Sequence, residues 1–133
     1  MGVSLYVTKG EELQEMGDGT QRAIRINLPC PHTVSMSYST MQAIAGAALA
    51  NGFPVGSMER EDYYVSVRGA ENLLAFAGAL SRSIQRGLPP WLTGGRESFV
   101  TAVIDACRWG AGYEKMSNAG MEHPGDPVWI TLV

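Results

Sequence analysis

Residues 86–98, with the sequence RGLPPWLTGGRES, join two segments that both show the pattern of a helix. Before the join, apolar residues recur at 4-3-4 spacing and predict a helix over residues 70–86. After it, the apolar spacing that begins at Phe99 predicts a second helix, which we expect to end at Gly110 and Gly112. The residues that define the first apolar face are Leu73, Ala77, Leu80 and Ile84.

The join itself is more apolar than a solvated loop. Trp91 follows two prolines, which present it rigidly, and Leu92 comes directly after it. Such a Trp either folds back over the ends of the helices or contacts a partner. Inward folding is favoured, because an exposed Trp-Leu patch lowers the solubility of a monomer. If the pair is exposed, an interface is the default explanation, since Trp is enriched at interface hot spots. Trp91 and Leu92 are therefore candidate interface residues.

Outward from this join, the chain alternates between strand and helix patterns. Apolar and polar residues alternate over five short segments, which predicts five half-buried strands. A helix over 39–50 has a capping box at Ser39 and Gln42 and a stop at Gly52. A shorter helix is expected over residues 8–16, where Thr8 and Glu11 form a second capping box. The predicted strands cover residues 3–8, 24–28, 34–38, 63–68 and 128–133.

These elements define the expected fold class. Strands lie at both ends and in the middle of the chain, without the regular repeat of a parallel α/β protein. The natural packing is α+β, with an antiparallel or mixed sheet of about 4–5 strands and three main helices on one of its faces. No linker divides the chain, so residues 1–133 are expected to form a single domain.

Composition limits the classes of function. The formal net charge of −3 argues against a general nucleic-acid binder. No apolar run approaches membrane length and no signal peptide opens the chain, so we expect a cytoplasmic protein that does not bind membranes. An acidic run at Glu59, Glu61 and Asp62 has the pattern of a solvated turn, with docking on a basic partner as the alternative.

The residues that could bind a metal or carry catalysis are scattered. Cys30, His32, Cys107 and His123 could ligate zinc, but they lack the paired spacing of a zinc site, so no metal is predicted. His123 and Asp126 could serve a nucleophile such as Cys30 or one of the serines 35, 37 and 39. No activating motif surrounds any of them. We therefore predict no catalytic residue and no cofactor, and the pattern favours a protein that is not an enzyme.

One segment has the pattern of an anion site. Gly94 and Gly95 precede a helix, so their backbone N–H groups can converge on an anion, and Arg96 could hold a phosphate or carboxylate. Ser98 completes this candidate ligand site. A plain flexible turn is the competing interpretation, because the spacing is not that of a P-loop.

The leading functional hypothesis is a non-enzymatic interaction or accessory protein, such as an inhibitor encoded by a phage or mobile element. Its partner would be another protein or a second copy of the chain. Tyr63 and Tyr64 join Trp91 and Leu92 as candidate interface residues, since adjacent residues of a strand point to opposite faces of a sheet. The alternatives are a small-ligand protein or enzyme that uses Gly94, and a structural subunit of a larger assembly.

Overall fold

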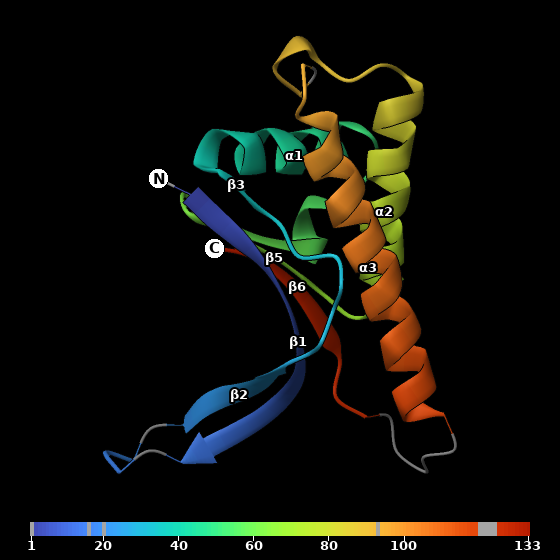
Figure 1. Cartoon of the computed structure of the whole chain (residues 1–133). Coiled ribbons are helices and arrows are strands. Elements are labelled where there is room, and N and C mark those ends of the chain that lie inside the picture. The colour runs from blue at the N-terminus through green and yellow to red at the C-terminus, as the bar shows by residue number, and fades with distance from the viewer. Residues whose placement is uncertain (1, 16, 20, 93, 120–124) are drawn as a thin grey trace.

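The structure, a computed structural model, describes residues 2–15, 17–19, 21–92, 94–119 and 125–133, and at 11–15, 21–24 and 91 it describes the course of the chain without side chains. Three helices pack on one face of a six-strand antiparallel sheet, which confirms the predicted α+β class (Figure 1). The sheet order is β2-β1-β6-β5-β4, and β3 pairs with the beginning of β1. The strands are β1 (Gly2–Glu15), β2 (Gln21–Asn27), β3 (Ser35–Ser37), β4 (Met58–Glu61), β5 (Tyr64–Arg68) and β6 (Val128–Leu132). The helices are α1 (Tyr38–Ala50), α2 (Ala70–Gln85) and α3 (Glu97–Asn118), with 3-10 turns η1 (Val55–Ser57) and η2 (Pro90–Leu92).

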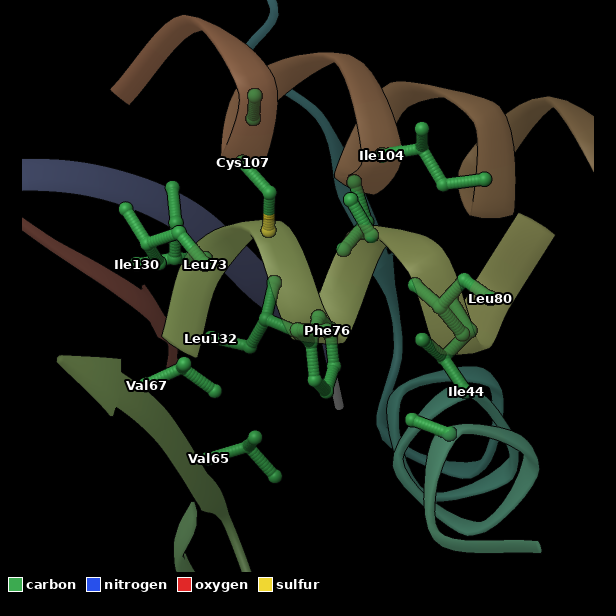
Figure 2. Close-up of a cluster of buried hydrophobic side chains, with 14 of the residues drawn as sticks. Ile44, Val65, Val67, Leu73, Phe76, Leu80, Ile104, Cys107, Ile130 and Leu132 are labelled. Atoms are coloured by element: carbon green, nitrogen blue, oxygen red, sulfur yellow. The ribbon is translucent and has the colours of Figure 1, made fainter. Parts of the chain in front are cut away.

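The core lies between the sheet and the three helices. Helix α2 runs alongside α3, and α1 lies across their upper ends (Figure 1). Figure 2 shows Leu73, Phe76 and Leu80 of α2 between the apolar residues of the sheet and those of α1 and α3. Leu73, Phe76 and Leu80 are at most 1% exposed, whereas Ile84, which the spacing assigns to the same apolar face, is 41% exposed and lies outside the core. Phe76 takes its place in the core because it lies on the side of α2 that faces the sheet.

The helix predicted over residues 8–16 is wrong. Residues Gly2–Glu15 form one long strand that pairs with β6 over its first half and with β2 over its second. A capping box is worth about 1 kcal/mol, and the two ladders outweigh it. Gly10 interrupts the strand at a register shift between Lys9 and Glu12 and has a φ of 134°, a backbone conformation that favours glycine.

Helix α3 continues past its predicted end at Gly110 and Gly112 to Asn118. Gly110 does not end the helix, because its missing side chain lets α3 approach the sheet. A Cβ at this position would lie 3.1 Å from Val128 Cγ1 and 3.2 Å from Leu73 Cδ1. The glycine is thus a packing residue rather than a helix stop.

Three further local predictions need correction. The N-cap of α1 is Ser37 and not Ser39, because the Ser37 hydroxyl accepts the Thr40 N–H at 3.2 Å. The acidic run at 59–62 is not simply a turn, since Met58–Glu61 forms the edge strand β4. Tyr63 lies in the turn between β4 and β5 instead of in a strand.

Candidate functional site on the uncovered sheet face

The sheet has one face that the helices do not cover, and Figure 1 shows that this face is concave. Its residues follow from the strand registers. Trp129 of β6 lies beside Arg68 of β5 on one side and Thr8 of β1 on the other, and Asn27 of β2 follows Thr8. The next row across the face contains Glu59, Ser66, Thr131 and Tyr6. We call this surface the open face.

Trp129 anchors the open face. Its indole Nε1 donates to the carbonyl oxygen of Gly10 at 3.1 Å, at the bulge of β1. The bulge bends β1 and brings its second half, with β2, toward the tryptophan. As a result Trp129 is only 5% exposed, although it lies on the face of the sheet opposite the three described helices. All five residues of β6 are therefore buried, whereas the alternation predicts a half-buried strand.

Two arginines flank the same indole ring. The guanidinium carbon of Arg25, from β2, lies 3.5 Å from the Trp129 ring centroid, and that of Arg68 lies 5.7 Å from it. Both distances are in the range of cation–π attraction. A guanidinium that stacks on a ring keeps its N–H groups in its own plane, where they can donate to a carboxylate or phosphate at the edge of the ring. The cluster of Arg25, Trp129 and Arg68 is therefore a cationic, aromatic patch.

Hydroxyl groups occupy the middle of the open face. The Ser66 and Thr131 hydroxyls are hydrogen-bonded at 3.2 Å and are buried. Thr8 Oγ1 is buried without a hydrogen-bond partner within the described part of the chain. Tyr6 is 46% exposed. A cavity of about 190 Å³ opens beside Arg68 and Trp129.

The predicted anion site lies elsewhere, at the beginning of α3. Gly94 and Gly95 have φ values of 70° and 100°, so they form the left-handed turn that the sequence indicates. The Gly95 N–H donates to the Glu97 carboxylate at 3.1 Å, and the Ser98 hydroxyl donates to the Gly95 carbonyl at 3.2 Å. Arg96 is exposed. The Glu97 carboxylate thus accepts the hydrogen bond from the Gly95 N–H, which an external anion would need. Anion binding at this site stays a prediction.

The candidate interface residues have different surroundings. Leu92 is fully buried in the core, which is the position expected for it if the join at residues 86–98 folds inward. The side chain of Trp91 lies outside the described residues. Tyr63 is 57% exposed and its ring contacts that of Tyr38 at a centroid distance of 4.8 Å. The Tyr64 hydroxyl donates to Glu59 Oε2 at 3.3 Å.

The thiols do not have the surroundings of nucleophiles. Burial raises the pKa of Cys30, and burial together with the neighbouring Cys30 raises the pKa of Cys107. Both thiols are therefore protonated at neutral pH, whereas a nucleophilic cysteine needs a lowered pKa. Within the described ranges, no three His, Cys, Asp or Glu side chains are grouped so that they could hold a metal ion. His123, proposed above as a base or ligand, lies outside those ranges.

Sequence reasoning missed the arginine-flanked tryptophan. Arg25, Arg68 and Trp129 each lie in a predicted strand, but the order of the strands in the sheet decides that they meet. A signal was present in the alternation, because Trp129 and Arg25 each fall on the polar side of their strands. An aromatic residue on such a side indicates a second contact surface.

Comparison with known proteins finds no match to a protein family, a curated protein or a solved structure. In the part of the chain that the structure describes, no helix is long and apolar enough to cross a membrane.

Proposed function

We propose that this protein is a non-enzymatic binding protein that docks an acidic segment of a protein partner on its open face. The observation that carries the proposal is the guanidinium of Arg25, whose central carbon lies 3.5 Å from the ring centroid of Trp129. Arginine and tryptophan are both enriched at interface hot spots, and a rigid, preorganised cation loses little side-chain entropy on binding. A second copy of the chain could supply the acidic segment, because Glu59 and Glu61 lie on the exposed edge strand β4.

The first experiment follows molecular mass by light scattering over a concentration series at low and high salt. Self-association through these charges gives a mass that rises with concentration and falls with added salt, since salt screens exposed charges. A constant monomer mass excludes the second copy as the partner. In that case the partner would be a different acidic protein, which the second experiment tests.

The second experiment measures binding of an oligoglutamate peptide, with an oligolysine peptide of equal length as its control. We expect Arg25→Ala to weaken oligoglutamate binding by about three- to tenfold, the usual effect of losing an exposed charged contact. Arg25→Lys keeps the charge but loses the planar stack, so it should have an intermediate effect. Arg108→Ala is the matched control, because Arg108 is an exposed arginine on α3. Equal binding by all four proteins, or no preference for oligoglutamate, would contradict the proposal.

A further inference from the structure

A cavity of about 540 Å³ lies between α1 and the end of α2, on the helical side of the molecule. Its volume is within the roughly 300–1,000 Å³ of sites that bind small molecules. Helix α1 lines it with Gln42 and with four residues no larger than alanine, so most of the α1 side of the cavity is apolar. At Gly46 an added Cβ would have no heavy atom within 4 Å. The small lining residues of α1 are Ala43, Gly46, Ala47 and Ala50.

Ser83 of α2 gives this cavity a buried polar group. The residue is 3% exposed and lines the cavity. Its hydroxyl is not a buried atom without a partner, because in the described part of the chain Thr8 Oγ1 is the one such side-chain atom. Because Ser83 lines the cavity, its hydroxyl can donate a hydrogen bond to a polar atom of a ligand there.

Arg86 places a positive charge at the rim. Its Nη1 donates to Asn51 Oδ1 at 3.1 Å, which holds the guanidinium beside the cavity. Arg82 donates to the Asn51 carbonyl oxygen through Nε at 3.1 Å and Nη2 at 2.8 Å. Helices α1 and α2 both end here, and each helix end contributes about half a negative charge. Two full positive charges exceed these, so the rim attracts anions.

We infer that this cavity binds a small amphiphile with an apolar chain and a single carboxylate. The apolar chain lies on Ala43, Gly46 and Ala47, where it removes its own surface and that of the methyl groups from water. The carboxylate accepts charge-assisted hydrogen bonds from Arg86 at the rim. Ser83, one turn before Arg86 on α2, donates to the same carboxylate. The site is separate from the open face and does not depend on the function proposed for it.

The test uses decanoate as the probe, with decanol and decylamine as uncharged and cationic controls of equal chain length. Binding is followed by the NMR signals of alanine methyl groups. Decanoate should shift the signals of Ala43, Ala47 and Ala50, with a dissociation constant below about 1 mM. The signals of Ala106 and Ala111, which are buried in α3, should not move. Decylamine should not bind, and decanol should bind more weakly than decanoate.

Two variants test the site without disturbing the fold. Gly46→Leu fills the cavity, and because the position is open and helical the variant should fold and lose decanoate binding. Gly112→Leu makes the same change on α3, where a Cβ also has open space, and should bind like the parent. Arg86→Gln should weaken decanoate binding about tenfold or more, whereas Arg108→Gln should not.

Several results would overturn the inference. If decanol binds as tightly as decanoate, or Arg86→Gln binds like the parent, the carboxylate assignment is wrong. If none of the three probes shifts the α1 methyl signals, or if folded Gly46→Leu still binds decanoate, the cavity is not a ligand site. Thermal unfolding of each variant establishes that it is folded before binding is measured.

Discussion

The close approach of α3 to the sheet can be tested with a pair of glycines on one helix. Gly110 faces the sheet, and a Cβ there would lie 3.1 Å from Val128 Cγ1, 3.2 Å from Leu73 Cδ1 and 3.6 Å from Val7 Cγ1. Gly112 is exposed, and a Cβ there would have no heavy atom within 4 Å. The perturbation is Gly→Ala at each position in turn.

The magnitudes follow from these contacts. Replacing glycine by alanine inside a helix stabilises it by about 1 kcal/mol, and this term is common to both positions. Gly112→Ala should therefore raise the free energy of unfolding by about 1 kcal/mol and the Tm by about 3–6 °C. At Gly110 the two contacts near 3.1 Å are tighter than ordinary packing, and such overpacking costs about 1–3 kcal/mol. Gly110→Ala should thus be between neutral and about 2 kcal/mol less stable than the parent.

The assay is urea unfolding of the parent and both variants. The useful quantity is the difference in free energy of unfolding between the two variants. The helix-propensity term is the same in both and cancels, so the packing cost of about 1–3 kcal/mol remains. If Gly110→Ala stabilises the protein as much as Gly112→Ala, α3 does not approach the sheet as closely as described. Gly110→Leu should then also be tolerated, whereas the structure predicts that it prevents stable folding.

Three further predictions concern the N-cap of α1, the Glu114 carboxylate that joins α2 to β6, and the thiol of Cys107. Ser37→Ala should lose about 1 kcal/mol of unfolding free energy and Ser39→Ala less than about 0.5 kcal/mol, because only the first hydroxyl caps α1; equal losses in urea unfolding would refute this. The Glu114 carboxylate accepts the first N–H of α2 at 3.0 Å and the first N–H of β6 at 2.7 Å, so Glu114→Ala should lose about 2–4 kcal/mol and Glu114→Gln clearly less. Burial raises the pKa of Cys107, so its contribution to stability is complete below the unfolded pKa of about 8.5 and falls by up to about 1.4 kcal/mol per pH unit above it. The slope of unfolding free energy against alkaline pH should be smaller in Cys107→Ala, and an unchanged slope would contradict the assignment.

The sequence predicts those parts of the fold that depend on local periodicity. The 4-3-4 spacing predicts α2 to within one residue at its end, since its apolar face decides its packing. The helix at 8–16 fails because Thr8 and Glu11 match a capping box locally, while the pairing that makes β1 a strand comes from β2 and the distant β6. The helix-stop rule for glycine uses only local sequence and fails at Gly110, because the role of this residue is set by Val128 across the core.

The candidate site depends almost wholly on such distant pairings. The alternation places Arg25 and Trp129 on the polar sides of their strands, but it does not say that β1 separates β2 from β6. Only that order, together with the bulge at Gly10, brings the guanidinium over the indole. The cap of α2 by Glu114 has the same origin, because a helix predicted to end at Gly110 could not include it.

The position of β6 in the sheet has a consequence for folding kinetics. This strand is the last in sequence among the described elements, yet it lies between β1 and β5, and its pairing joins Leu5 to Leu132. Contacts between such distant residues form slowly, because the chain must lose much entropy before they are made. Until residues 128–132 emerge from the ribosome, the inner edges of β1 and β5 lack their partner strand. Unpaired strand edges promote association between chains, so we expect nascent and refolding molecules to aggregate most readily before this final insertion.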